Sequence, residues 1–512
     1  MRCWRGMSRR KQTLLLLLGC AFLSQSCEAL WGPFGRENPA NCVVSSAGCG
    51  ADEVCEPTSQ VCVSALRLDS ATPALASSRG GTTVTLRGQR FVAGAAVFVD
   101  EQPATDVVVV SSEELRFTLP GSTRGLWRVP VAVQNPSQHR SERRDLFAYY
   151  AETLAFESRS IAVSGLPIDA AVGDWNGDQK LDLAVIGIPS SGVQILIGDG
   201  SGGFSAAGSV AVGSATMTTN HIASIDGNHD GKSDLLVAAG GSLNLLLGDG
   251  QGGFPTRRVL YSAAVGNVLG ALAVGDYDGD GRADIVLSDV VSDNSAAKVV
   301  LLPNGGDDGF ATQSIIETSQ PPSLLRIADL TADARSDVLV GIEGTRLSLW
   351  RNDGGSARTR IDLPLSGCSA RNAAVGDLDH DGRQDLLLRC DASLRPLLSL
   401  GDGQFSPLSD HPLPPPSSLS RSLALSDLNG DGWLDGGMGS GDGSGGAKVV
   451  GVLGDGMGGF SAEQEIAGYP ASMLNVAHSL QTADWDGDGK IDVLSLSSSA
   501  NPSCRLLLNR SR

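Results

Sequence analysis

A nine-residue acidic motif occurs seven times in the last two thirds of the chain. Each copy is a variant of Asp-x-[Asp/Asn]-x-Asp-Gly-x-x-Asp, and the copies begin at Asp174, Asp226, Asp276, Asp329, Asp377, Asp427 and Asp484. The copies start about 50 residues apart, and a repeat of this length is typical of solenoids, propellers and other arrays of one small unit. The fold must therefore hold seven similar units side by side.

Short apolar runs that read as β-strands surround each motif. In the first unit the runs are Ala170–Val172, Leu183–Ile186 and Ile195–Ile197, and a Gly-Asp-Gly turn then leads to a fourth strand from Phe204. Four strands in about 50 residues form one propeller blade. The sequence thus predicts an all-β fold with a seven-bladed β-propeller over residues 151–512.

The two ends of the array predict how the ring closes. The residues after Asp484 have room for three strands but not for a fourth. The segment Phe156–Ser164 is similar to the fourth strand that begins at Phe204. We expect it to complete the last blade, which would join the ring by main-chain hydrogen bonds and leave no open edge.

The motif has the composition of a calcium-binding loop. Positions 1, 3, 5 and 9 carry side-chain oxygens, and position 7 offers a backbone carbonyl. Hard oxygen ligands in a flexible arrangement suit Ca²⁺ better than Mg²⁺. The flanking strands and the missing Glu at position 12 distinguish the motif from an EF-hand loop. We expect up to seven Ca²⁺ sites, with these ligands: Asp174, Asn176, Asp178, Lys180, Asp182; Asp226, Asn228, Asp230, Lys232, Asp234; Asp276, Asp278, Asp280, Arg282, Asp284; Asp329, Asp333, Arg335, Asp337; Asp377, Asp379, Asp381, Arg383, Asp385; Asp427, Asn429, Asp431, Trp433, Asp435; Asp484, Asp486, Asp488, Lys490, Asp492.

The seven loops are not equivalent. The loops that begin at Asp276, Asp377 and Asp484 carry four carboxylates, and three others have one Asn in place of an Asp. The loop at Asp329 has Thr331 at position 3 and an Ala where Gly is usual, so it is the weakest candidate and the one we expect to be empty.

The charge balance narrows the possible partners. The chain has 57 acidic and 39 basic residues, a formal net charge of −18. Most of the excess acid lies in the loops, where packed carboxylates repel one another unless a cation is bound. A strongly negative protein repels phosphates, so nucleic-acid binding is excluded.

The N-terminus reads as a secretory signal over residues 1–26. Basic residues precede the apolar run Leu14–Leu18, which is too short to span a bilayer. Cys20 follows Leu-Leu-Gly, which resembles the lipobox of bacterial lipoproteins, and Cys27 leaves a longer apolar core. Lipidation at either cysteine and plain cleavage stay open. We expect an exported protein, anchored as a cell-surface or outer-membrane lipoprotein or otherwise secreted.

Export makes disulfides the expected state of the cysteines. Besides Cys27, a Cys-rich segment over 27–64 contains four cysteines whose pairing the sequence leaves open among three choices: Cys42, Cys49, Cys55 and Cys62. Their spacing is unlike the paired Cys-x2-Cys of zinc sites. Cys368 and Cys390 flank a predicted hairpin, so we expect them to pair and Cys504 to remain a buried thiol.

Residues 65–150 contain short alternating apolar runs punctuated by Gly and Pro, which is typical of a small β-sandwich. The run Gly80-Gly81-Thr82-x-Val84-Thr85-Leu86-x-Gly88-x-x-Phe91, with Thr72-Pro73 before it and Phe147-Ala148-Tyr149 after it, resembles the TIG (IPT) immunoglobulin-like family. The resemblance implies a spacer or interaction module without catalysis.

The seven motifs and the turns of the Gly198–Phe204 type resemble FG-GAP or VCBS repeats, as in the integrin α-subunit propeller and many bacterial surface proteins. The resemblance implies adhesion or ligand binding on the face opposite the Ca²⁺ loops. The acidic loops and the Gly-Asp-Gly turns should share one face. The other connections vary within this chain, as loops that bind ligands do, and we expect a glycan or protein ligand there: Ile188–Ser191, Asp289–Ala297, Gly436–Gly446 and His411–Ser417.

No catalytic constellation is apparent in the sequence. Three Gly-x-Gly-x-x-Gly stretches, as at Gly198–Gly203, lead into strands and not into the helix that a dinucleotide requires. We therefore expect a binding protein and not an enzyme. The alternative is a calcium-dependent polysaccharide lyase or another propeller enzyme, with its catalytic base assembled across blades.

Overall fold

The computed structural model divides the chain into two compact units, residues 1–150 and 151–512, and each is described by itself. It describes residues 53–55 and 62–511 apart from internal gaps at 123–126, 138, 189–191, 213–220, 240, 292, 307–308, 312, 343–345, 355–357, 364, 414–421, 442–446, 470–478 and 498–503. The predicted signal over 1–26 lies outside the described residues. Within them, no helix is long and apolar enough to cross a membrane.

The first unit is a β-sandwich. One sheet has the order β3 (Arg67–Thr72), β5 (Thr83–Gln89), β9 (Glu114–Thr118), β8 (Thr105–Val109), and another the order β12 (Arg140–Arg143), β11 (Val131–Gln134), β6 (Ala96–Val99), β7 (Gln102–Pro103). A third sheet has the order β10 (Trp127–Arg128), β13 (Ala148–Tyr150), β4 (Leu75–Ser77), and a separate hairpin pairs β1 (Glu53–Cys55) with β2 (Cys62–Ser64).

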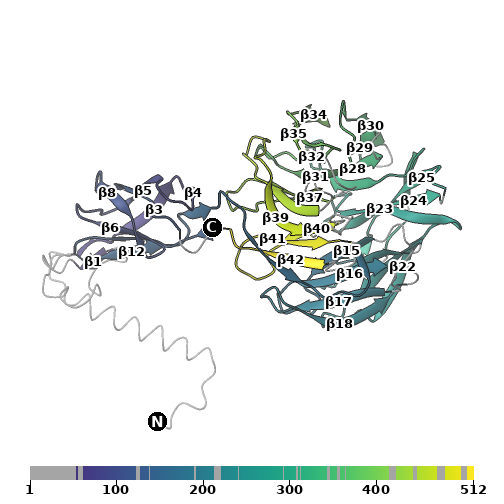
Figure 1. The fold of residues 1–512 in the computed structure, drawn as a ribbon, viewed down its shortest axis with the longest axis horizontal. Helices are drawn as coiled ribbons and strands as arrows, with labels where there is room; N and C mark the ends of the chain where they lie inside the picture. The colour runs from purple at the N-terminus through teal and green to yellow at the C-terminus, as the bar shows by residue number, and fades with distance from the viewer. Residues whose placement is uncertain are drawn as a thin grey trace, which may run out of the picture. The chain divides into compact units, whose positions relative to one another are not determined.

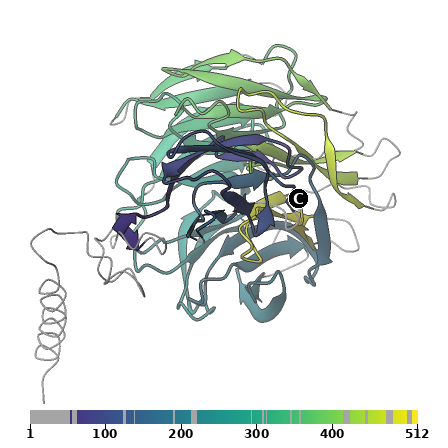
Figure 2. The ribbon, with the colours of Figure 1, turned by 90° about the vertical axis from the view of Figure 1, so that its left-hand side faces the viewer.

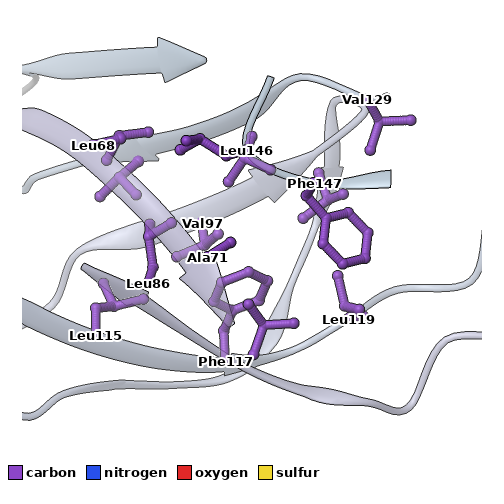
Figure 3. Packing of buried hydrophobic residues seen from close by; sticks show 14 of the residues in the cluster. Leu68, Ala71, Leu86, Val97, Leu115, Phe117, Leu119, Val129, Leu146 and Phe147 are labelled. Carbon is purple, nitrogen blue, oxygen red and sulfur yellow. The ribbon is translucent and has the colours of Figure 1, made fainter. Parts of the chain in front are cut away.

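Alternation of apolar and polar residues produces the core of this sandwich. Along β5, Val84 and Leu86 are fully buried while their neighbours are not, because successive side chains point to opposite faces. They pack with Leu115 and Phe117 of β9 and with Val97 of the facing sheet (Figure 3). The predicted immunoglobulin-like sandwich is confirmed.

Within the described residues, the second unit contains seven four-stranded antiparallel sheets (Figure 1). The first four are β15 (Leu166–Gly173), β16 (Asp182–Ile188), β17 (Gly192–Gly198), β18 (Phe204–Ala211); β19 (His221–Ile225), β20 (Asp234–Ala239), β21 (Ser242–Leu247), β22 (Thr256–Ser262); β23 (Asn267–Gly275), β24 (Asp284–Val291), β25 (Ala297–Leu302), β26 (Gln313–Thr318); and β27 (Leu324–Ala328), β28 (Asp337–Ile342), β29 (Arg346–Asn352), β30 (Arg358–Asp362).

The other three sheets are β31 (Asn372–Gly376), β32 (Asp385–Arg389), β33 (Ser393–Gly401), β34 (Gln404–Pro407), with β35 (His411–Pro412) also pairing with β33; β36 (Leu423–Ser426), β37 (Asp435–Gly441), β38 (Ala447–Val452), β39 (Gln464–Tyr469); and β40 (Ser479–Ala483), β41 (Asp492–Leu496), β42 (Cys504–Asn509), β14 (Phe156–Ser160).

The sheets stand around a ring, as Figure 2 also shows. The first strands of successive sheets contact one another, and β15 of the first sheet contacts both β19 and β40. An apolar cluster fills each interface between neighbouring sheets, including the interface between the seventh and the first, where Leu494 and Leu506 pack with Leu183 and Leu196. The predicted all-β propeller is confirmed.

The seam follows the predicted three-plus-one arrangement. β14 is the outer strand of the seventh sheet and pairs with β42, from Phe156 opposite Asn509 to Ser160 opposite Arg505. Two bonds extend the ladder beyond β14: Arg510 N–H donates to the Ala155 carbonyl at 2.7 Å and Ile161 N–H to the Cys504 carbonyl at 3.0 Å. The first residues of the unit thus hold its last strand in place.

Strand bounds correct two predicted recognition loops. Asp289 is the sixth residue of β24 and is buried, where it accepts hydrogen bonds from the Tyr261 hydroxyl at 2.6 Å and the Asn267 amide at 2.7 Å. The connection after β24 is therefore only residues 292–296. Likewise Gly436–Gly441 belongs to β37, and the connection after it is residues 442–446. The sequence pattern missed both strand ends, because Asp289 is polar although it is buried and because β37 is rich in glycine.

The cysteines of the second unit behave as predicted. Cys368 and Cys390 form a disulfide, and Cys504 is a buried free thiol. The backbone pairs Cys55 with Cys62 across β1 and β2, but the predicted disulfides among Cys42, Cys49 and these two lie outside the described residues.

The seam can be tested with proline. Hydrogen-bonded residues alternate along an antiparallel strand, so the bonds of Ala155 and Ile161 place the Glu157 N–H toward the Leu508 carbonyl and the Ser158 N–H away from β42. Glu157→Pro should leave the buried Leu508 carbonyl without its donor, which costs about 1–3 kcal/mol of folding free energy.

Ser158→Pro and Glu157→Ala are the controls, and urea unfolding followed by circular dichroism is the measurement. Both controls should destabilise the protein clearly less than Glu157→Pro. If the two proline variants unfold at the same urea concentration, β14 does not close the ring through this ladder.

Candidate functional site

Every acidic motif forms the connection between the first and second strands of a sheet. In the first sheet it joins β15 to β16, and the turn over 199–203 joins β17 to β18 at the same edge, where Gly173 pairs with Asp182 and Gly198 with Phe204. Antiparallel order makes the other connections fall on the opposite edge. The predicted sharing of one face by the acidic loops and the Gly-Asp-Gly turns is confirmed.

A fully buried aspartate at position 9 ties each loop to its sheet. Asp284 accepts a hydrogen bond from Tyr277 N–H at 2.8 Å through Oδ2 and another from Asn304 N–H at 2.7 Å through Oδ1. One donor lies at loop position 2 and the other at the end of the third strand. The same pair of bonds, between 2.7 and 3.1 Å, recurs at all seven position-9 residues: Asp182, Asp234, Asp284, Asp337, Asp385, Asp435 and Asp492.

Sequence reasoning assigned position 9 only to a metal and missed this structural role. A signal was present, because each of these residues opens a second strand whose next two residues are apolar or glycine. A carboxylate in a wholly buried strand needs internal donors.

The other acidic positions accept hydrogen bonds from the loop's own backbone. Asp276 receives N–H bonds from Gly279 and Gly281, at 2.8 and 2.9 Å, and Asp280 receives one from Arg282 at 2.9 Å. Gly281 has a φ of 83°, a region that glycine enters without steric cost. The loop is therefore closed by its own aspartates.

Three loops bring three carboxylates within 4.8 Å of one another: Asp276, Asp278 and Asp284; Asp377, Asp379 and Asp385; Asp484, Asp486 and Asp488. These are the loops that carry four carboxylates. Convergent hard oxygens fit Ca²⁺, and the crowding is electrostatically costly without a cation. Burial raises the pKa of Asp278 and Asp284, and it raises the pKa of Asp492 to about 7.

The loop at Asp329 differs, as its sequence suggests. The Thr331 hydroxyl is buried and donates to Asp337 at 3.1 Å, so position 3 turns inward to the structural carboxylate. Among the described residues no group of three carboxylates forms in this loop. Its emptiness stays a prediction.

Position 7 provides a counterion that the sequence analysis did not foresee, because it considered only the carbonyl. The Arg282 guanidinium forms an ion pair with Asp280, and Arg383 lies 2.6 Å from Asp381. Lys180 and Lys232 approach the position-5 aspartates of their loops more loosely, at 3.8 and 3.7 Å. A metal ion would share the position-5 carboxylate with this cation.

The sixth and seventh loops depart from this arrangement. Trp433 stands at position 7 of the sixth loop, and burial raises the pKa of Asp435 there to about 8. In the seventh, Arg510 from beyond β42 lies 2.7 Å from Asp486 and 3.4 Å from Asp488. The residue that follows β42 thus places a positively charged side chain beside the last loop.

Side chains at positions 2 and 4 pack and bridge. Trp175, Tyr277 and Trp485 at position 2 are buried, which confirms their predicted packing role. The His380 ring of the fifth loop lies 4.4 Å from the Trp433 ring of the sixth, so it contacts the neighbouring loop.

One polar cluster lies on the first strands of three neighbouring sheets, β15, β19 and β40. The Ser479 hydroxyl donates to Asp169 at 3.0 Å, and His221 Nδ1 lies 3.5 Å from the same carboxylate. Among the described residues Ser479 has no hydrogen bond to His221. A serine nucleophile needs the histidine as its base, so the cluster is not a triad.

Comparison with known proteins gives two family matches. The FG-GAP-like repeat matches residues 174–237, 226–287, 329–388 and 377–435, and the IPT/TIG domain matches residues 66–149. The search of curated proteins found no match.

Several solved structures are similar to this chain at low identity. A structure described as the recognition of non-reducing terminal N-acetylglucosamine by an Agrocybe aegerita lectin is 16% identical, with a TM-score of 0.46 over 83% of this chain and 98% of that one. An auxiliary nutrient binding protein from Bacteroides ovatus is 11% identical (TM-score 0.39, 87% and 98%), and so is a putative phosphatase from Bacteroides thetaiotaomicron (0.37, 88% and 98%).

These distant structural likenesses do not bear on function. The family matches coincide with the structure, because the FG-GAP-like segments begin at acidic loops and the IPT/TIG segment spans the sandwich. The chain contains four FG-GAP-like repeats and, before them, an IPT/TIG domain.

Proposed function

We propose that this chain is an exported, surface-anchored, calcium-binding propeller that binds a glycan or protein ligand and does not catalyse a reaction. The observation that carries the proposal is the contrast between the two edges of the sheets. One edge repeats the acidic loop seven times, as a scaffold would, whereas the opposite edge is joined by connections that differ from blade to blade. Varied loops on a rigid scaffold are where recognition usually lies.

Calcium would be held by the oxygens at positions 1, 3, 5, 7 and 9 of the loops. The best candidates are the loops with three convergent carboxylates. The ion would supply positive charge to carboxylates whose burial otherwise disfavours their ionised form. It would also stiffen the loops on which the ring depends.

Export and anchoring follow from the basic and apolar N-terminus with its cysteines at 20 and 27. That the chain binds without catalysing a reaction is proposed from the sequence, in which no catalytic constellation is apparent.

Calcium removal gives the first test of this proposal. At ~2 mM Ca²⁺ and a site dissociation constant near ~0.1 mM, each filled site adds up to about 1.8 kcal/mol. EDTA should therefore lower the Tm of the propeller markedly. Asp280→Ala should reduce the calcium-dependent gain in Tm more than Asp333→Ala, which changes the same position of the weakest loop. An unchanged Tm in EDTA would show that the loops are not metal sites.

The buried aspartates should matter with or without calcium. Asp284→Ala leaves two buried N–H donors unpaired, so we expect a loss of about 3 kcal/mol of folding free energy in EDTA. Asp280→Ala should cost clearly less under the same conditions. Denaturant unfolding of both variants in EDTA checks this order, and equal losses would contradict a separate structural role for position 9.

Ligand binding can be examined with the full-length protein on a glycan array and in a pull-down from cells. We expect a glycan or protein to bind in calcium and to be retained when the exposed turn residue Met457 is changed to Ser. Release of reducing ends from a bound polysaccharide would reveal a lyase instead. Loss of binding in Met457→Ser would place the ligand on the face of the acidic loops and not on the opposite face.

A further inference from the structure

A cavity of about 270 Å³ lies between the third and fourth sheets of the propeller. Its walls come from the end of β26 and from β28, β29 and β30, which Figure 1 labels in part. The residues that matter here are Thr318, Ile342, Arg346, Ser348, Trp350 and Arg360.

The cavity reaches the edge away from the acidic loops. β28 begins at Asp337, beside its loop, and ends at Ile342, and β29 returns from Arg346. β26 also ends on this side, at Thr318. Trp350 pairs with Val338, one residue after Asp337, so the cavity extends from there along the sheet to the edge for which we propose ligand binding.

One face of the fourth sheet supplies a rigid floor. Val340 pairs with Ser348, Ile342 with Arg346 and Trp350 with Arg360, so these side chains share one face of the sheet. Val340 and Trp350 also pack with residues of the third sheet such as Ile316. Two blades thus hold the aromatic ring in place.

The polar wall contains two guanidinium groups, those of Arg346 and Arg360, and the Glu317 carboxylate. Asp362 accepts hydrogen bonds from the Ser348 hydroxyl at 2.7 Å and from Arg360 Nε at 2.9 Å and Nη2 at 2.6 Å. The Arg360 guanidinium stands 6.0 Å from the centroid of the Trp350 ring. Arg346 makes no hydrogen bond or ion pair with any residue of the described part of the chain.

We propose that this cavity binds one sugar unit that carries a carboxylate, such as a uronic acid within a glycan. The sugar ring would lie against Trp350, and the Arg346 guanidinium would hold the carboxylate through its planar pair of donors, near the second guanidinium of Arg360. This rests on the proposed function, because it takes the ligand to be a glycan. A neutral sugar would leave the Arg346 guanidinium without a hydrogen-bond partner, and a protein partner needs about 800 Å² of surface per side, far more than such a cavity offers.

The experiment measures binding of tetragalacturonate and of its methyl ester to the full-length protein by calorimetry at one fixed Ca²⁺ concentration. The ester keeps the rings and removes the charges. Arg346→Gln is the test variant. Arg258→Gln removes the same charge from an exposed position of β22 and is the matched control.

We expect the ester to bind at least about tenfold more weakly than the acid, and Arg346→Gln to weaken binding of the acid by a similar factor. Arg258→Gln should stay within about twofold of the wild type. Glu317→Gln should leave binding unchanged or tighten it, because it removes a negative charge from the cavity wall.

Other results overturn the proposal in distinguishable ways. Equal affinity for acid and ester, no binding of the acid, or equal effects of the two arginine variants would each reject this cavity as a uronate site. A ligand from the array that binds Arg346→Gln as well as wild type would keep the proposed function and reject the cavity. A protein that binds nothing on the array or in the pull-down would overturn both.

Discussion

The propeller depends on one buried carboxylate in each sheet. The position-9 aspartate is inaccessible to water and accepts main-chain hydrogen bonds from the loop and from the end of the third strand. Burying a charge in an apolar sheet is costly unless donors surround it. Here the donors are backbone N–H groups that a turn leaves without strand partners. The carboxylate therefore gains the donors it needs, and the N–H groups gain an acceptor. This interaction fixes the position of every acidic loop relative to its sheet.

The same arrangement explains why the loops are closed before any ion binds. Aspartates at positions 1, 3 and 5 accept N–H bonds from the loop itself, and a basic side chain at position 7 offsets part of their charge. The calcium ion that we propose would enter a formed ring of oxygens and would not have to order a coil, which reduces the entropic cost of binding. The sixth loop has Trp433 in place of the basic residue at position 7, and burial raises the pKa of its Asp435 to about 8.

Much of this fold follows from the period of the sequence. Seven motifs with four apolar runs each predict the blades, and the missing last strand predicts the seam between Phe156 and Asn509. Local reading fails where a residue acts over a distance. The bond from Asn304 to Asp284 joins residues that no motif connects, and Arg510 reaches Asp486 only because the ring brings β42 next to the seventh loop. Asp289 reads as a loop residue because its partners lie far from it in the sequence: Tyr261 is on β22 of the neighbouring sheet and Asn267 on the adjacent strand β23.

The two edges of the ring use their charge in opposite ways. At the acidic edge, carboxylates are in excess, which suits the calcium that we propose for the loops. At the other edge, between the third and fourth sheets, Asp362 is already bonded to Ser348 and Arg360, and Arg346 is the group that we propose to bind an anion. Interfaces between blades are suited to such a site, because the apolar clusters that hold the ring together also keep an aromatic ring rigid at the surface. Each of the other interfaces has the same apolar layer with different side chains at its outer edge. A change of specificity in this architecture therefore needs only exposed residues at the ends of two strands, while the buried aspartates and the seam remain as they are.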